Sequence, residues 1–286
     1  MTPYFSAGAV IGESFKVVFR CFLTIVGISF LCCLPFILVM ERTTEMEKVR
    51  REAILKGVDA PPSEPDLATT FGSLLIYVTY PLASGAIAIA VHRSFRGESV
   101  SFAAAFGAGL KRIFALFGVF VSSLLFMGVG FVPAILFLRF SVGALPWPLV
   151  LVGFLLLSIL ALALFMMVYV SIPVCIVERK GVFASMRRSR ELTAGHRWNL
   201  FVVMIGVFLS SYVIGIVAGI VAGVGLIAAS PSSGKAQGSL ALVLLLSTAF
   251  GALFIAWNAA APAVAYCHLA RVKDTQADDD VLKAFD

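Results

Sequence analysis

The feature that most constrains this chain is a series of long apolar segments that contain almost no charge. Three of them, 113–138, 148–177 and 199–229, contain no Asp, Glu, Lys or Arg. A helix needs about 20 apolar residues to cross a bilayer, and a helix satisfies its own backbone polar groups where no water is present. The sequence therefore predicts an all-α polytopic membrane protein.

Six segments are long enough to span a membrane, and charged residues, Pro, Ser or Gly bound each of them. Only 13% of the 286 residues are charged, and the mean hydropathy is +1.00; a soluble domain is roughly one-quarter charged. A conventional cytosolic enzyme is therefore excluded. We expect one integral membrane domain over 1–286, with spans at about 19–40, 71–91, 113–138, 148–177, 199–229 and 239–267.

Lys and Arg are unevenly divided between the two sets of loops. With the N-terminus in the cytoplasm, fifteen of the 22 Lys and Arg residues lie on the cytoplasmic side. Short cytoplasmic loops carry the excess of these residues in membrane proteins. Because the number of spans is even, both termini are predicted to be cytoplasmic.

Glycines near the starts of spans one, three and five, and prolines within spans two, four and six, recur about every ninety residues. They are Gly27, Gly118 and Gly206, and Pro81, Pro173 and Pro262. Each unit has two spans, so the copies share one orientation, and a symmetry axis would follow the membrane normal. We expect three parallel two-helix repeats, each opening with a cytoplasmic interfacial amphipathic helix, at about 1–97, 98–180 and 181–286.

A basic segment, 181–198, links the fourth and fifth spans, and we call it the elbow. Val182, Met186 and Ser189 recur at helical spacing as a weakly apolar face, which predicts an amphipathic helix lying on the membrane surface. Its cations have two interpretations: they fix topology, or they contact anionic lipid head groups or a protein partner. The candidate contact residues are Arg187, Arg188, Arg190 and Arg197.

The elbow also carries a family resemblance. The run ERKG at 178–181, followed by ASMRRSRELTAGHRW at 184–198, resembles the signature of the bacterial glycerophosphoryl diester phosphodiesterase membrane-domain proteins. YciC-like six-span proteins are similar, and the resemblance covers about 168–274. It implies a multi-pass domain of the bacterial inner membrane. Some members carry a fused phosphodiesterase domain, but we expect none here, because no soluble segment is long enough to fold as one.

Residues that carry chemistry are few and scattered. The histidines are His92, His196 and His268, each near a cytoplasmic helix end, and the chain has no P-loop motif. Metal-dependent phosphodiester hydrolysis would need several carboxylates and histidines around one cation. The five cysteines show no metal-ligand spacing. We therefore expect no enzymatic activity, no cofactor, no metal site and no nucleic-acid partner.

Span five carries three glycines at four-residue spacing, Gly215, Gly219 and Gly223. Such a stripe lets helices approach closely. It predicts helix packing, either inside the monomer or between two protomers of a homo-oligomer.

The repeated prolines point to a candidate pocket. Each proline leaves the carbonyl four residues earlier without its helical donor, and these positions are Tyr77, Tyr169 and Asn258. Freed carbonyls at membrane depth should face protein or a polar cavity. The sequence thus predicts either a central polar pocket or simple helix kinks whose polar side chains bind their neighbours.

Two functions remain open. The preferred one is a non-enzymatic scaffold or accessory domain in envelope or lipid homeostasis, which contacts anionic lipid, or a membrane or envelope protein partner, through the basic elbows. The alternative is a small transporter or lipid-translocating protein that uses the pocket between the return helices. The absence of ionisable residues from the spans argues against a proton-coupled carrier.

Overall fold

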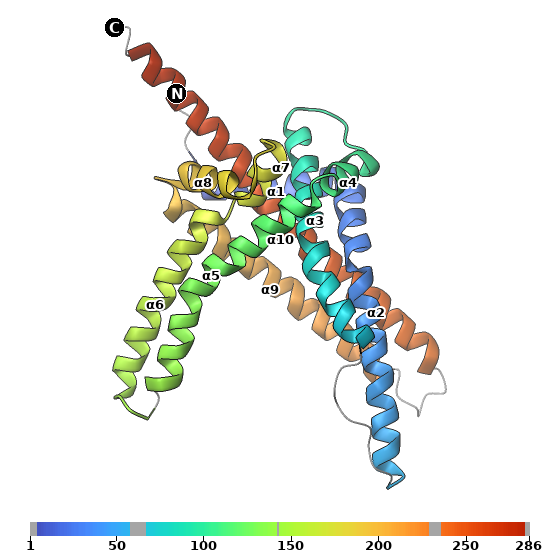
Figure 1. Ribbon diagram of the computed structural model, residues 1–286. Helices are drawn as coiled ribbons and strands as arrows, with labels where there is room; N and C mark the ends of the chain where they lie inside the picture. Colours follow the sequence, from blue (N-terminus) through green and yellow to red (C-terminus); the bar gives the residue numbers. More distant parts are fainter. Residues whose placement is uncertain (1–4, 58–66, 142, 229–235, 284–286) are drawn as a thin grey trace.

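The computed structural model describes residues 5–57, 67–141, 143–228 and 236–283, and every regular element in these ranges is a helix (Figure 1). The expectation of an all-α fold is confirmed for this part of the chain. The helices are α1 (Ala7–Arg20), α2 (Phe22–Leu55), α3 (Leu67–Phe95), α4 (Phe102–Leu110), α5 (Ile113–Ser141), α6 (Trp147–Val168), α7 (Ser171–Val177), α8 (Val182–Thr193), α9 (Arg197–Ala228) and α10 (Ala236–Lys283).

Five stretches of the described residues are long and apolar enough to cross a membrane. They are Thr70–Phe95, Ile113–Ser141, Trp147–Val177, Arg197–Val221 and Thr248–Asp274. The number is six if α1 and the first part of α2, which meet at 86°, are counted as one bent span. The expectation of a helical membrane protein agrees with these stretches, and the expected number of six spans is reached only if the bent pair counts as one.

The first span begins later than the sequence predicts. Residues 19–21 belong to the end of α1 and to the bend, and the straight part starts at Phe22. Val10, Val17 and Val18 form the buried face of α1, while Phe19 is 71% exposed. Because α1 is amphipathic, it lies across the start of α2 instead of extending it.

Two helices continue well past their expected ends. The segment after 40 was expected to be a loop, yet α2 continues to Leu55. The segment after 267 likewise stays helical, and α10 ends at Lys283. Residues 41–55 are rich in Glu, Lys and Arg, which have high helix propensity. Charge therefore marks the end of the apolar stretch here, but not the end of the helix.

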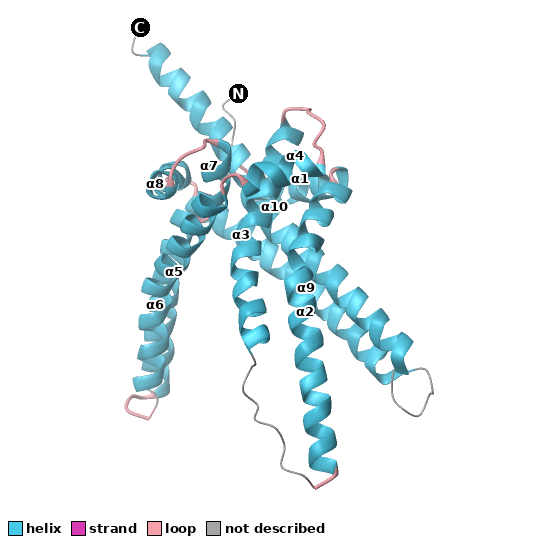
Figure 2. Cartoon of the chain, turned by 45° about the vertical axis from the view of Figure 1, so that its right-hand side comes forward, coloured by secondary structure: helices cyan, strands magenta, loops and turns pink. Residues whose placement is uncertain are grey.

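The long helices form three hairpins, α2 with α3, α5 with α6 and α9 with α10, which diverge like the legs of a tripod (Figures 1 and 2). They spread away from the end of the molecule that holds α1, α4 and α8. We call these three helices the short-helix layer. The hairpin of α5 and α6 has the least contact with the rest of the chain. Only 17% of the apolar stretch of each of its helices is buried, against 59% for α3 and 56% for α10.

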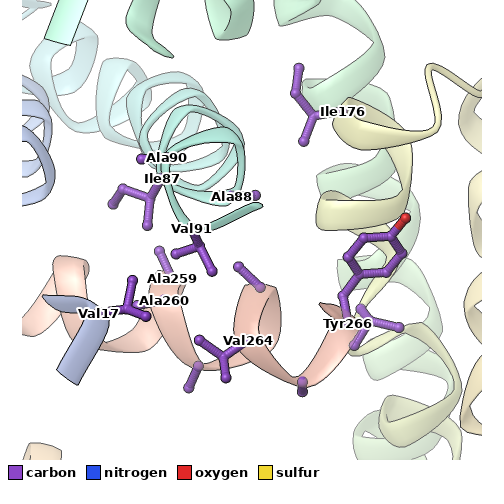
Figure 3. Packing of buried hydrophobic residues seen from close by; sticks show 14 of the residues in the cluster. Val17, Ile87, Ala88, Ala90, Val91, Ile176, Ala259, Ala260, Val264 and Tyr266 are labelled. Carbon is purple, nitrogen blue, oxygen red and sulfur yellow. The ribbon is translucent and has the colours of Figure 1, made fainter. Parts of the chain in front are cut away.

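The core lies where α3 and α10 cross, just below the short-helix layer. Ile87 and Val91 of α3 are fully buried, and they lie toward Ala259 and Ala260 of α10 (Figure 3). Alanine leaves little between two backbones, so these helices can approach closely. The alanine-rich segment of α10 from 259 to 265 thus sets where α3 and α10 cross.

Three glycines near the starts of long helices face residues of the short-helix layer. A Cβ atom added at Gly27 would lie 3.5 Å from Phe102, at Gly118 2.8 Å from Val182, and at Gly206 2.6 Å from Ile11. The last two distances leave no room for a side chain. Consequently α2 contacts the start of α4, α5 contacts the start of α8, and α9 contacts α1.

The prolines of the return spans have different effects. Pro81 and Pro262 lie inside the continuous helices α3 and α10. Pro173, in contrast, lies just after a break: α6 ends at Val168 and α7 starts at Ser171. Of the three, only the span with Pro173 is interrupted beside its proline.

Candidate functional site

Residues Val182–Thr193 of the elbow form helix α8, one side of which packs against the rest of the molecule. Its buried residues include Ser185, Met186, Ser189 and Leu192, and the Ser189 hydroxyl donates a hydrogen bond to the Met167 carbonyl oxygen at 2.8 Å. After α8 ends, Gly195 adopts φ +86°, the left-handed conformation that glycine accepts without strain. This turn redirects the chain into α9.

The four candidate cations of the elbow lie in different surroundings. The Nε atom of Arg187 lies 3.6 Å from Oε1 of Glu191, and Nη1 of Arg188 lies 3.7 Å from Oε2 of the same residue. Arg190 is exposed. The Nε atom of Arg197 is buried and has no hydrogen-bond partner among the described residues. Arg190 and Arg187, whose side chain is 82% exposed, are therefore the two exposed cations of the set.

Glu178 connects three elements beneath the elbow. Its carboxylate lies 2.6 Å from Nζ of Lys180 and 3.4 Å from Nε of Arg188, and it accepts a hydrogen bond from the Tyr266 hydroxyl at 3.2 Å. The Glu178 side chain is 19% exposed. This carboxylate thus ties the end of α7 to α8 and α10.

Arg112, at the start of α5, holds the same loop from the other side. Its guanidinium donates to the carbonyl oxygens of Cys175, Arg179 and Lys180, at 2.8, 2.7 and 3.3 Å. Arg179 has φ +53°, and it is the one non-glycine residue with positive φ in the part of the chain that the structure describes. This conformation costs on the order of 1 kcal/mol for a residue with a Cβ atom. The hydrogen bonds from Arg112 to the loop hold Arg179 in this conformation.

A cavity of about 690 Å³, open to the surface, lies beside α4, and we call it the α4 cavity. Four cations line it: Arg93 from the end of α3, Lys111 and Arg112 from the α4–α5 junction, and Arg179. Small residues of α4 and two isoleucines form the rest of the wall, and no carboxylate does among the described residues. From the sequence alone, these cations are only topology signals.

A smaller groove of about 310 Å³ lies beside α1. Lys16, Arg20 and Arg271 contribute to its lining, but so does Glu13. Oε2 of Glu13 also lies 2.7 Å from Nε2 of His268. Unlike the α4 cavity, this groove contains a carboxylate of its own.

The predicted membrane pocket exists only in part. A cavity of about 240 Å³ lies between α3, α5, α6, α7, α9 and α10, and Tyr169 and Asn258 both line it. Tyr77 does not: its side chain is 55% exposed, and Tyr80 takes the place in α3. Equal spacing from a proline does not ensure equal rotation of the helix, and three residues turn a helix by about 300°.

Three polar residues of this membrane cavity, Asn258, Ser123 and Ser171, have partners within the chain. The Asn258 amide donates to the Ser211 hydroxyl at 3.0 Å and to the Phe254 carbonyl oxygen at 2.9 Å. The hydroxyls of Ser123 and Ser171 are 3.3 Å apart. These contacts correspond to the simpler interpretation of the prolines, in which polar side chains bind their neighbours.

The glycine stripe of α9 has no close neighbour among the described residues. A Cβ atom added at Gly215, Gly219 or Gly223 would meet no described atom within 4 Å. Gly215 nevertheless lines a cavity together with Phe254 and Asn258 of α10, so the interpretation of the stripe as helix packing, inside the monomer or between protomers, stays a prediction. Close glycine packing occurs in the α5–α6 hairpin, where a Cβ at Gly130 would lie 2.5 Å from Cα of Ala161.

Comparison of the chain with family models, with curated proteins and with solved structures finds no match. The resemblance carried by the elbow stays a prediction. No group of three or more His, Cys, Asp or Glu residues that could hold a metal ion occurs within the described ranges.

Proposed function

We propose that this protein is a non-enzymatic integral membrane domain whose short-helix layer contacts anionic lipid head groups. It would act as a scaffold or accessory protein in envelope or lipid homeostasis. One observation carries the proposal: the elbow exposes Phe183 and Trp198, at 82% and 75%, on the same segment as Arg187 and Arg190. Aromatic rings and cations together are typical of a helix at the membrane–water interface.

The orientation and the repeat belong to the same proposal. The end of the molecule that carries the short-helix layer faces the cytoplasm of a bacterial inner membrane, since the loops and helix ends on this side hold fifteen of the 22 Lys and Arg residues. Three units at about 1–97, 98–180 and 181–286 each contain one short helix and one hairpin. The contacts of Gly27, Gly118 and Gly206 support this arrangement, because each unit's glycine faces the next unit's short helix, and the third faces the first.

The transporter alternative has one specific observation in its favour, the membrane cavity that Tyr169 and Asn258 share. Its volume of about 240 Å³ lies below the roughly 300–1,000 Å³ usual for ligand pockets. If it binds a polar solute, Tyr169→Phe would weaken binding by about 0.5–1.5 kcal/mol, the net worth of a neutral hydrogen bond. Unchanged solute binding in this variant would remove the alternative.

Retention of anionic lipid, measured by native mass spectrometry of protein released from membranes, tests the main proposal. The double variant Arg187→Gln, Arg190→Gln removes two exposed cations and leaves the Glu178 contacts intact. Each cation near an anionic surface contributes on the order of 1 kcal/mol, so the loss of two should weaken lipid binding by about 2 kcal/mol, or about thirtyfold.

The matched control is Arg139→Gln, which removes an exposed cation in the last turn of α5, at the opposite end of the hairpin. Retention in this variant should equal that of the wild type. Equal retention in the elbow variant and the wild type would reduce the elbow cations to a topology signal.

A further inference from the structure

The α4 cavity concentrates positive charge from parts of the chain that are far apart in sequence. Arg93 ends α3, Lys111 follows α4, and Arg179 follows α7. Only Arg93 has a carboxylate within 4.0 Å, that of Glu98, and the latter is 51% exposed. No ion pair involves Lys111, Arg112 or Arg179 within the described ranges. The cavity therefore carries a net positive charge that the chain itself does not balance.

The backbone conformation of Arg179 is fixed by contacts within the chain. Its left-handed backbone would suit glycine, and Gly181 lies only two residues later, in an ordinary conformation. Arg112 instead fixes the carbonyl of Arg179 at 2.7 Å, which aligns an exposed cation on the cavity. A non-glycine residue held in such a conformation is a recurring mark of a binding site.

The two other short helices provide an internal comparison. Beside α1, the groove contains Glu13. Beside α8, Glu178 contacts Lys180, Arg188 and Tyr266. In both places a carboxylate of the chain lies among the cations, and the α4 cavity is the one of the three without such a group in its lining.

We propose that the α4 cavity binds a phosphate group, held by Arg93, Lys111 and Arg179. Guanidinium and ammonium groups form short, charge-assisted hydrogen bonds with phosphate oxygens, and Arg matches two oxygens at once. Arg112 acts as a positioning residue, because its donors are engaged by backbone carbonyls.

The walls of the cavity leave space for more than the phosphate itself. The side facing α4 consists of Ala103, Ala104, Gly107 and Ala108, and a Cβ atom added at Gly107 would meet no described atom within 4 Å. A phosphate that belongs to a larger molecule therefore fits without displacing a side chain.

The phosphate can come from a lipid head group or from a soluble molecule. The lipid source rests on the proposed function, in which the short-helix layer lies at the membrane surface; the soluble source does not. The cavity and the elbow use different residues, so each can fail while the other holds.

Thermal unfolding of the purified full chain tests the proposal in two arms. One arm adds inorganic phosphate to protein in a neutral detergent, and the other uses nanodiscs of phosphatidylcholine with or without phosphatidic acid. A ligand that binds the folded state raises Tm in a concentration-dependent way. The wild type should be stabilised in at least one arm, and the arm that responds identifies the source of the phosphate.

Arg179→Asn is the central variant. Asn tolerates the left-handed conformation, so the fold should persist, while phosphate binding should weaken by about tenfold or more. Gly107→Leu is the second variant, since it fills the cavity without changing charge. Arg139→Gln and Gly12→Leu are the matched controls: one removes an exposed cation in the last turn of α5, far from the cavity, and the other adds a side chain at an open glycine of α1.

Loss of the ligand-dependent rise in Tm in Arg179→Asn and Gly107→Leu, with wild-type behaviour in both controls, supports the proposal. It is overturned if the wild type responds in neither arm, or if both cavity variants respond as the wild type does. An equal loss in Arg139→Gln would also overturn it, because general surface charge would then explain the effect.

Discussion

The elbow and the α4 cavity both belong to the short-helix layer, and both gather cations, yet their charge balance differs. In the elbow region, Glu178 and Glu191 lie within 3.7 Å of Lys180, Arg187 or Arg188. In the α4 cavity the closest carboxylate is that of Glu98, 4.0 Å from Arg93. Lys180 and Arg188, which pair with the mostly buried Glu178, have little left to offer a ligand. The number of cations is thus a poor guide to an anion site, and the missing carboxylate is a better one.

Glu178→Gln should have the largest effect on stability. It should also remove the difference in charge balance between the elbow and the α4 cavity. It removes a negative charge that is mostly buried and that Lys180, Arg188 and Tyr266 contact. We expect the free energy of unfolding to fall by about 2 kcal/mol, in line with hydrogen bonds to charged groups. Denaturation followed by circular dichroism measures the loss.

The same variant should make the elbow resemble the α4 cavity. Lys180 and Arg188 would lose their shared carboxylate, so added sulfate should restore part of the stability. Glu191→Gln is the control; its side chain is 53% exposed, and it should cost about 0.5 kcal/mol or less. Equal losses for the two variants would contradict the central role of Glu178.

Arg112→Lys should have the next effect. The guanidinium reaches three carbonyl oxygens, whereas an ammonium group is a point charge that cannot keep this fork-shaped set of contacts. We expect a loss of about 1–2 kcal/mol in stability, together with weaker phosphate binding as Arg179 loses its support. Unfolding curves with and without phosphate separate the two effects, and an unchanged phosphate response would show that Arg112 does not position the cavity.

Ala104→Glu should give the α4 cavity the carboxylate that it lacks, with little cost in stability. Ala104 follows Glu13 of α1 by 91 residues, the same spacing as between Gly27 and Gly118. It lies in the first turn of α4, where its amide donates to the Ser101 hydroxyl at 3.2 Å. Glu at this position completes a capping box, so stability should change by no more than about 0.5 kcal/mol.

The new carboxylate would enter the wall of the α4 cavity, and phosphate should bind about tenfold more weakly. Ala104→Gln, of the same size but uncharged, should keep most of the binding. If titration calorimetry finds the two variants equal, the missing carboxylate is not what makes the cavity a site.

The smallest effect concerns pH. Desolvation, together with the charge of Lys273, lowers the pKa of His196 at the end of the elbow below its usual 6.5. Below pH 6.5 the unfolded chain takes up this proton more readily, so the free energy of unfolding should rise with pH from the lowered pKa to about 6.5 and then level off.

His196→Asn should remove that slope. No histidine lines the α4 cavity among the described residues, so sulfate binding there should not change between pH 5.5 and 7.5. A slope that persists in the variant would assign the titration to another group.

The sequence predicts the helices of this protein better than their ends. Segments 113–138 and 148–177 match Ile113–Ser141 and Trp147–Val177 closely, because Lys, Arg or Pro bounds them. The bend at Cys21 carries no Gly or Pro, and it depends on how α1 packs across α2. Residues 41–55 have high helix propensity, so α2 continues to Leu55 although its apolar stretch has ended. The pattern of apolar runs does not reveal this.

The α4 cavity was beyond sequence reasoning for a similar reason. Arg93, Lys111 and Arg179 come from three separate segments, and only the fold brings them together. Each looks like a topology signal on its own. The proline pattern placed Tyr169 and Asn258 in one cavity but chose Tyr77 over Tyr80, since the rotation of α3 is set by packing against α10 and not by the position of Pro81.

Anomalous diffraction from crystals soaked in selenate, a heavier analogue of phosphate and sulfate, tests the central claim most directly. The account predicts a peak within hydrogen-bond distance of Arg93, Lys111 or Arg179, and no peak beside Glu178. Selenate bound at the elbow while the α4 cavity stays empty would contradict it.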